Sequence, residues 1–247
     1  MGRVENMMKI TEKVYLVGGS GFGISPTGDC NVYLLDGGSE MALIDTGGGN
    51  GAKDILKNVR SMGLAPKKIS ISFNTHSHFD HIGGNYDIKN ATGCKIASSD
   101  LDKNSIETLD ELSLYDMALE RGLDFKPTSV DITLDDGDIQ EIGDIELEVI
   151  HNPGHTPGCI SFKMVDEGKI SIFCGDIAGA NGRLGYINGP GFNLPDWKSS
   201  IKKLIKHEPD RLYPGHNTFL LGNAMEHLLV YDAKMNAAWT NIVTSIG

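Results

Sequence analysis

The chain has 247 residues, of which 40% are hydrophobic and 22% charged, so it has the length and composition of a globular protein that buries a full core. No apolar run approaches the roughly 20 residues that cross a bilayer, and residues 1–9 lack the apolar segment of a secretion signal, which excludes a membrane-spanning class and predicts a cytoplasmic protein. The formal net charge of −11, without a local basic patch, excludes a nucleic-acid-binding class because an acidic surface repels phosphate.

The first part of the chain predicts strands separated by glycine turns. The strand-like segments cover residues 14–18, 31–36, 41–45 and 69–73. Between the third and the fourth, residues 53–62 are predicted as a helix because their apolar residues recur on one face. The fourth strand leads directly into a polar run.

That run, Thr-His-Ser-His-Phe-Asp-His-Ile-Gly-Gly at residues 75–84, places three histidines and an aspartate within six positions. Imidazole nitrogen and carboxylate oxygen are the ligands that suit zinc and similar first-row ions. A single histidine is more often a core or surface residue, but packing does not account for three of them beside an aspartate. We therefore predict a loop at the end of a strand, in which His76, His78, Asp80 and His81 converge on metal.

Residues 100–122 follow a helical pattern in an otherwise acidic segment. The apolar residues at helical spacing are Ile106, Leu109, Leu112, Tyr115 and Leu119. The first interpretation is a helix whose apolar face packs on the body of the protein. Because the segment lies between two groups of candidate site residues, a lid or a homodimer surface is the alternative.

The second half of the chain repeats the scheme of the first. Strand-like segments cover residues 130–134, 145–150, 159–164, 169–174 and 211–213, and helices are predicted at 195–207 and about 222–240. In each half one strand ends on an aspartate, Asp45 or Asp176. We expect two sheets packed together with helices outside, in a single domain over residues 1–247 with related halves of about 1–125 and 126–247, because no linker divides them.

Three further residues of ligand type lie next to glycine at turns that follow predicted strands. They are His155, in the Pro-Gly-His-Thr-Pro-Gly turn at 153–158, Asp176 and His216. Each alone would be read as a polar surface or core residue. Because sites in layered α/β proteins assemble at the carboxyl ends of strands, their combination with the histidine run predicts one shared metal site.

Together these residues resemble the metallo-β-lactamase superfamily, whose fold is an αββα sandwich of two mixed β-sheets flanked by helices. The matching pieces are Asp45, the run His76-x-His78-x-Asp80-His81, His155, Asp176 and His216, and they extend over most of the chain in the family's order. The combination is specific for the superfamily but not for a substrate.

The resemblance implies a centre of two metal ions, with two Zn²⁺ per chain or iron or manganese in their place. His76, His78 and His155 would bind the first ion, Asp80, His81 and His216 the second, and Asp176 would bridge both. Asp45 would orient a ligand histidine. Thr75 and Thr156 would do the same, unless they are exposed turn hydroxyls.

The resemblance also implies hydrolysis of an ester-type bond (a lactone, thioester or ester) in a small molecule by a metal-bridging hydroxide. Asp80 would carry the proton to the leaving group. No Ser or Cys nucleophile is required, and the four cysteines (Cys30, Cys94, Cys159 and Cys174), none in a C-x-x-C pair, are predicted as reduced buried thiols. The alternative function is that of a persulfide dioxygenase with one iron ion, a class that keeps much of this motif set but uses fewer of its ligands.

Other features narrow the substrate in part. Only 31 residues follow His216, fewer than the C-terminal helical domain with which glyoxalase II-like thioesterases grip glutathione. The common lactamases have a cysteine at the position of Asp176, which argues against that activity. Lactonases have a tyrosine shortly after this aspartate, whereas residues 177–180 contain none, so Tyr186 is the candidate catalytic residue to replace it. The glycine-rich loops 18–29 and 178–197, the second with Phe192 and Trp197, are expected to line the mouth for a small, partly apolar substrate.

Overall fold

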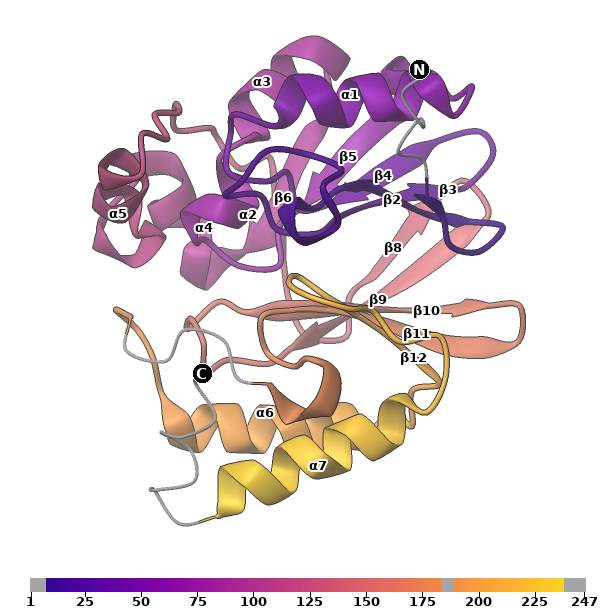
Figure 1. The fold of residues 1–247 in the computed structure, drawn as a ribbon, viewed down its shortest axis with the longest axis vertical. Helices are drawn as coiled ribbons and strands as arrows, with labels where there is room; N and C mark the ends of the chain where they lie inside the picture. The colour runs from indigo at the N-terminus through magenta and orange to yellow at the C-terminus, as the bar shows by residue number, and fades with distance from the viewer. Residues whose placement is uncertain (1–7, 184–188, 238–247) are drawn as a thin grey trace.

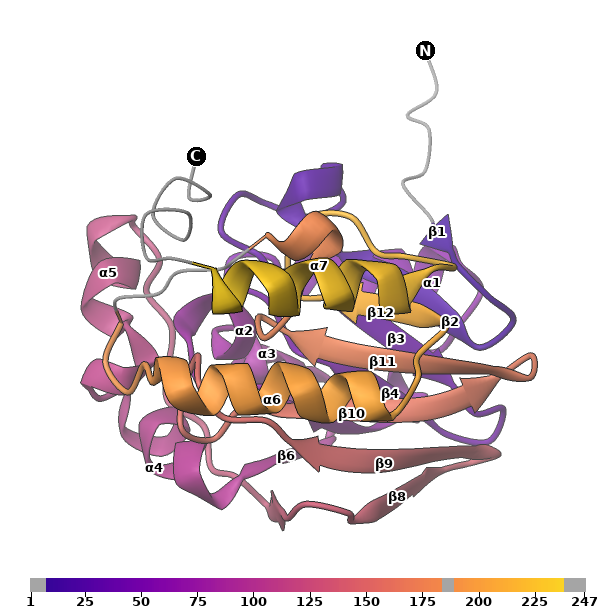
Figure 2. The ribbon, with the colours of Figure 1, turned by 90° about the horizontal axis from the view of Figure 1, so that it is seen from below.

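The computed structural model describes residues 8–183 and 189–237, which form two β-sheets packed face to face with helices on both outer faces (Figure 1). This arrangement confirms the predicted αββα sandwich of two mixed sheets. Figure 2 shows α6 (Leu194–Lys206) and α7 (Ala224–Asn236) side by side across the second sheet. None of the helices in this described part of the chain has both the length and the apolarity that a bilayer crossing requires.

The first sheet contains seven strands that neighbour one another in chain order. They are β1 (Met8–Lys9), β2 (Val14–Gly18), β3 (Val32–Asp36), β4 (Met41–Ile44), β5 (Ile69–Phe73), β6 (Lys95–Ser99) and β7 (Ile132–Leu134). The pairs from β1 to β4 are antiparallel and those from β4 to β7 parallel. Because parallel neighbours need a crossover, helices α1 (Ala52–Ser61), α3 (Asn85–Thr92) and α4 (Asp100–Thr108) return the chain across one face.

The second sheet contains five strands in the order β12-β11-β10-β9-β8. They are β8 (Ile139–Ile142), β9 (Ile145–His151), β10 (Ile160–Asp166), β11 (Lys169–Gly175) and β12 (Arg211–Pro214). Only β11 and β12 are parallel, with α6 as their crossover. Strand β7 still belongs to the first sheet, so the chain crosses from the first sheet to the second after residue 134. The two related halves were expected to divide near residue 125.

The strands are apolar on both faces because each sheet is covered on both sides. In β2, Val14 and Leu16 face the second sheet, whereas Tyr15 and Val17 face the helices. Such burial on both faces produces continuous apolar strands instead of alternating ones. On the outer face of the second sheet, α6 contributes Trp197, which is fully buried.

Residues 100–122 do not form the single helix that their periodicity predicts. Helix α4 ends at Leu109 (φ 56°), a short 3₁₀ turn follows, and α5 (Tyr115–Glu120) starts after Leu114 (φ 57°). Asp110 accepts a hydrogen bond from the Leu112 N–H at 3.1 Å and so starts the new turn at its amino end. Ile106 is buried in the core between the first sheet and its helices, which agrees with the packed-helix interpretation, but Leu119 is 46% exposed.

Five strands and α-helices of the described residues were not predicted, namely β1, β6, β8, α3 and the single turn α2 (Phe79–Ile82). Their apolar residues are too few to show a period: α3 has Ile88 as its single large buried apolar side chain, and in β6 only Ile96 and Ala97 are apolar. Tertiary packing, and not periodicity, determines these elements.

Candidate metal centre

The seven predicted ligands lie just after strands of the two sheets. They are His76 and His78 after β5, Asp80 and His81 on the single turn α2 (Phe79–Ile82), His155 between β9 and β10, Asp176 after β11 and His216 after β12. Because β11 and β12 are parallel and Gly175 pairs with Pro214, the residues that follow these two strands lie close together. The fold therefore brings these side chains together at the ends of strands, but Asp80 and His81 lie on a helical turn and not in the predicted loop.

The first group of ligand atoms belongs to His76, His78 and His155. One nitrogen of each imidazole lies within 4.8 Å of the others, and none of the three residues is more than 4% exposed. Their Nε2 atoms have no hydrogen-bond partner among the described residues. Buried polar atoms are normally paired, so three neighbouring imidazoles with unpaired buried nitrogens fit a cation better than they fit packing.

The second group belongs to Asp80, His81 and His216, whose ligand atoms also lie within 4.8 Å of one another. The Nε2 atom of His216 is 3.0 Å from Asp80 Oδ2, and that of His81 is 3.9 Å from the same oxygen. The side chain of His216 is 40% exposed, so this group lies at the opening of the site, whereas the first group lies deeper.

Asp176 lies between the two groups. Its Oδ1 atom is 3.4 Å from His81 Nε2, and its Oδ2 atom is 3.6 Å from His155 Nε2 and 3.4 Å from His216 Nε2. Ligand atoms bound to one tetrahedral zinc ion at about 2.0–2.2 Å lie about 3.3–3.6 Å apart. The carboxylate of Asp176 therefore has the spacing of a ligand toward both groups.

Burial and mutual charge set the protonation of the first group. Burial lowers the pKa of all three of its histidines, and neighbouring imidazoles lower the pKa of His76 and His78 further. The neutral imidazole is the form that binds metal. The first group is therefore poised to accept a cation near neutral pH.

The carboxyl groups of Asp80 and Asp176 are held in their charged form by the neighbouring histidines. Burial would raise the pKa of Asp80, but His81 and His216 outweigh it and lower the pKa to about 2. Burial would also raise the pKa of Asp176, yet the adjacent histidines hold it well below its usual range. Both carboxyl groups are thus anionic, as ligands of a cation must be.

Asp45 orients two of the histidines. Its Oδ2 atom is 2.8 Å from His81 Nδ1 and accepts a hydrogen bond from the Thr75 hydroxyl at 2.9 Å, and its Oδ1 atom accepts one from the Thr75 N–H at 2.8 Å. The Thr75 oxygen is in turn 3.1 Å from His76 Nδ1. With both Nδ1 atoms paired in this way, the Nε2 lone pairs of His76 and His81 point into the centre.

The threonines are not the exposed turn hydroxyls that the alternative supposed. Thr75 is 1% exposed and Thr156 is 0% exposed. Thr156 donates a hydrogen bond to Asp102 at 2.8 Å, and none of its hydrogen bonds within the described part of the chain is with a ligand imidazole.

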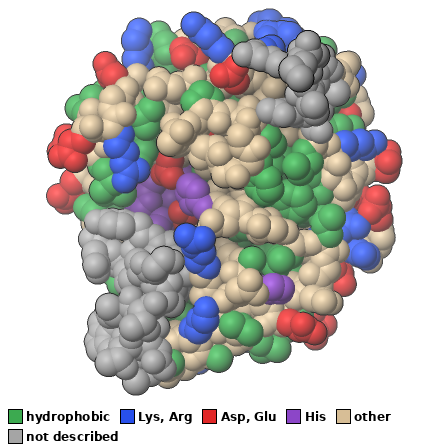
Figure 3. Space-filling model, in the orientation of Figure 1, with side chains coloured by type: hydrophobic (Ala, Val, Ile, Leu, Met, Phe, Trp, Pro, Cys, Tyr) green, Lys and Arg blue, Asp and Glu red, His purple; other side chains and the backbone are tan. Residues whose placement is uncertain are grey.

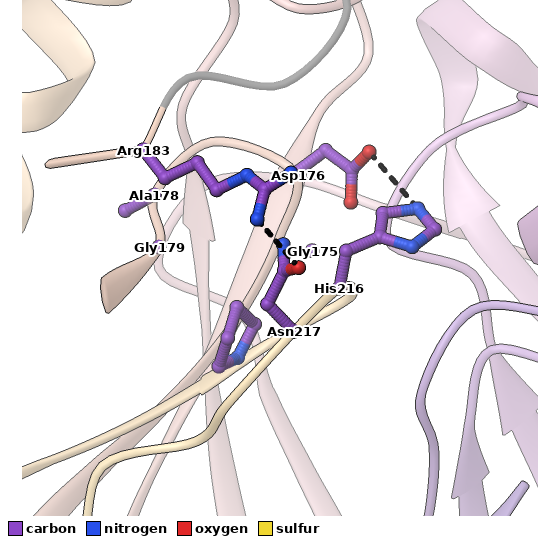
Figure 4. A pocket seen from close by; sticks show the side chains of 8 residues that line it. Gly175, Asp176, Ala178, Gly179, Arg183, His216 and Asn217 are labelled. Carbon is purple, nitrogen blue, oxygen red and sulfur yellow. Dashed lines mark hydrogen bonds and ion pairs between the residues drawn. The ribbon is translucent and has the colours of Figure 1, made fainter. Parts of the chain in front are cut away.

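The opening of the site has a lining that sequence reasoning missed. Arg183 and Asn217 line it together with Asp176 and His216, and the Arg183 guanidinium donates a hydrogen bond to Asn217 Oδ1 at 3.1 Å (Figure 4). On the face shown in Figure 3, histidine and acidic side chains reach the surface together beside a Lys or Arg side chain. No motif or spacing marks Arg183 or Asn217 in the sequence.

The residues of loops 18–29 and 178–197 that were expected to line the mouth of the site lie elsewhere or outside the described residues. Trp197 is fully buried in the core that α6 and α7 form with the second sheet, where its indole N–H donates to Ile177 O at 2.7 Å, so it does not line the mouth. Phe192 packs on Trp197 with ring centroids 5.6 Å apart. Of the described residues that line the opening, none comes from loop 18–29. Tyr186, the candidate to replace the lactonase tyrosine, lies outside the described residues.

The four cysteines are free and buried, as predicted. Burial raises the pKa of the Cys159 thiol, so this residue is not an activated nucleophile despite its position near His155.

Comparison with known proteins gives one consistent result. The family model for the metallo-beta-lactamase superfamily matches residues 25–216. The probable metallo-hydrolase YqgX of Bacillus subtilis is 30% identical over 209 residues, which cover 83% of this chain and 90% of that protein. The acyl-coenzyme A thioesterase MBLAC2 of Homo sapiens is 28% identical over 215 residues, 76% of this chain and 74% of that protein.

Two further proteins differ in how much of the chain they match. A hydroxyacylglutathione hydrolase of Rhodospirillum rubrum is 33% identical over 125 residues, 51% of this chain and 39% of that protein. A solved structure, a subclass B3 metallo-beta-lactamase of Bradyrhizobium japonicum, matches with a TM-score of 0.76 at 22% identity, covering 97% of this chain and 94% of that one. At this identity the likeness of the solved structure is one of fold.

Proposed function

This chain belongs to the metallo-beta-lactamase superfamily, and we propose that it is a dinuclear-metal hydrolase that cleaves an ester-type bond, above all a thioester, in a small anionic molecule. The observation that supports this most directly is the position of Asp176 between two complete groups of ligand atoms. Zinc is the ion proposed, and iron or manganese would also accept this set of nitrogen and oxygen ligands.

The residues of the chain would divide the work as follows. His76, His78 and His155 would hold one ion, Asp80, His81 and His216 the other, and Asp176 would bind both. Bound metal would supply Lewis acidity and a water molecule of lowered pKa. Asp80, whose side chain is 21% exposed at the opening, would hand a proton to the leaving group. The side chain of Asp45 would keep the histidines in the tautomer that binds metal.

Arg183 supports an anionic substrate. Of the described residues that line the opening, Arg183 is the single arginine or lysine, and it lies there together with the ligands Asp176 and His216 in a protein of net charge −11. A guanidinium binds carboxylate and phosphate through paired hydrogen bonds. We therefore propose that it binds an acidic group of the substrate away from the bond that breaks.

The thioester preference rests on this charge together with the relatives. Two of them have names that specify thioester hydrolysis, of acyl-coenzyme A and of hydroxyacylglutathione. Both coenzyme A and glutathione are anionic, which agrees with the proposed role of Arg183. A cytoplasmic location is part of this proposal and is supported by the four free cysteines.

The persulfide dioxygenase alternative is less well supported. An oxygenase with one iron ion does not need a second group, yet Asp80, His81 and His216 form one with all three ligands in place. We therefore retain the hydrolase as the proposed function.

Elemental analysis and a substrate panel test the proposal. Protein purified without added metal should contain about two ions per chain and hydrolyse acyl-coenzyme A or acyl-glutathione faster than lactones or aryl esters. A chelator should abolish turnover, and metal should restore it. One iron ion per chain with oxygen uptake on a persulfide would contradict the hydrolase.

The role of Arg183 has its own test. Arg183→Gln should raise KM for an anionic thioester about 3- to 30-fold, equivalent to about 0.7–2 kcal/mol for an exposed charged contact, and leave KM for a neutral thioester unchanged. Equal effects on both substrates would remove Arg183 from anion recognition.

A further inference from the structure

Asp102 is a buried carboxylate that joins two loops of the metal centre. It lies in the first turn of α4 and is 0% exposed. Its Oδ2 atom accepts hydrogen bonds from the Ser77 N–H and from the Thr156 hydroxyl, both at 2.8 Å. Its Oδ1 atom accepts one from the Gly158 N–H at 2.8 Å. All three donors are distant from it in sequence.

Two of these donors are direct neighbours of proposed metal ligands. Ser77 stands between His76 and His78, and Thr156 follows His155. The three histidines of the first group come from these two loops alone. A backbone hydrogen bond from Ile160 N to Thr75 O joins the same segments where the strands end, but the Asp102 carboxylate joins them beside the ligands themselves.

The loop 153–158 is shaped to admit this carboxylate. A Cβ atom at Gly158 would overlap the Asp102 side chain, so a residue with a side chain there would push the carboxylate away. Glycine at this position thus allows the backbone N–H to approach the carboxylate closely.

Burial opposes the ionised form of the carboxyl group in this place. Burial raises the pKa of Asp102, and the hydrogen bonds from Thr156, Ser77 and Gly158 lower it only in part. A carboxyl group whose pKa is higher in the folded than in the unfolded chain costs folding free energy at neutral pH. What the ionised group contributes is the relative position of two loops.

We propose that Asp102 is a positioning residue of the metal centre, which holds the His76–His78 loop and the His155 loop at the separation that lets their three imidazoles bind one ion. This inference rests on the proposed function, since it supposes that the first group binds metal. Loss of the carboxylate should therefore weaken the binding of one of the two ions and leave the binding of the other unchanged.

Metal affinity of the Asp102→Asn variant is the test. An amide has one acceptor oxygen in place of two, so it cannot serve donors at both Oδ1 and Oδ2. Metal-free protein is titrated with Zn²⁺ against a chromophoric chelator, and with Co²⁺ to follow its d–d absorption. The variant should lose about 10- to 100-fold in affinity for one ion and retain the other. Asp100→Asn, which removes an exposed carboxylate from the same helix, should bind both ions like the unaltered protein.

A second pair of variants tests the positioning role of Asp102 if circular dichroism shows that Asp102→Asn does not fold. Thr156→Val removes one donor and should lower affinity for the same ion by a smaller factor, whereas Thr156→Ser keeps the hydroxyl and should restore it. Unchanged affinities in Asp102→Asn or, where that variant does not fold, in Thr156→Val would overturn the inference, as would an equal loss for both ions. An unaltered protein that binds no metal would instead contradict the proposed function.

Discussion

Replacement of Asp45 by asparagine should weaken the metal centre through the orientation of its histidines. The carboxylate is 1% exposed and accepts three hydrogen bonds, two at Oδ2 and one at Oδ1. If the amide oxygen takes the place of Oδ2, the NH₂ group opposes the Thr75 N–H and leaves a buried donor unpaired. If the amide is turned, the NH₂ group faces His81 Nδ1 and forces the proton of that imidazole onto Nε2, the atom that faces Asp80 and Asp176.

The magnitude follows from these two orientations. An unpaired buried donor costs about 1–3 kcal/mol of unfolding free energy. Loss of a partner that orients a ligand histidine typically costs 10- to 100-fold in metal affinity, about 1.4–2.7 kcal/mol. We therefore expect Asp45→Asn to lose about 1–3 kcal/mol of stability without metal, and to bind the ion at Asp80, His81 and His216 10- to 100-fold more weakly.

The assay separates the two effects. Urea unfolding of metal-free protein gives stability without the contribution of bound ions, and a chelator competition titration gives the affinity for each ion. Asp36→Asn serves as the control, because the one side-chain hydrogen bond of Asp36 among the described residues is with a turn N–H at the surface, that of Gly38 at 3.0 Å. If Asp45→Asn binds both ions as tightly as the unaltered protein, the tautomer argument is refuted.

Four other variants test the centre and the fold. His78→Ala and Asp176→Ala should each lose metal and turnover while circular dichroism stays unchanged; retained metal content in both would contradict the ligand assignment. Asp80→Asn should reduce kcat about 100-fold or more while KM changes little, because it removes the proposed proton carrier and alters a proposed ligand of the second ion; an unchanged kcat would remove Asp80 from the role of proton carrier. Burial would raise the pKa of Asp131, but Lys89 at 2.6 Å and the Ile96 N–H lower it, so this carboxyl stabilises the fold above its unfolded pKa of 3.8 and loses that contribution as the pH falls. Asp131→Asn should therefore cost about 0.5–1 kcal/mol at pH 7 and progressively less below pH 4 in urea denaturation, and a cost independent of pH would argue against the ion pair.

Much of the fold could be predicted from local pattern. The strand at 69–73 and the apolar face of α1, with Ile55, Leu56 and Val59 buried, agree with the predicted elements. Periodicity failed at Leu109 and Leu114, because two left-handed residues divide the segment into separate turns and the hydrophobic spacing does not record backbone conformation. The expectation that Trp197 lines the mouth came from its place in the glycine-rich loop 178–197 and not from periodicity, and it is wrong because α6 packs this side chain against the second sheet.

The sequence by itself determined the candidate ligands of the histidine run. His76, His78, Asp80 and His81 lie within six positions of one short segment, so their side chains are necessarily close to one another. The relations between distant segments were decided only by the tertiary structure. Nothing near Asp102 in the chain indicates that its carboxylate reaches Ser77 and Gly158, and nothing near Arg183 indicates its place beside His216. A short motif fixes which atoms can bind metal because its residues are neighbours, whereas the support around them depends on how helices and loops from both sheets pack against that motif.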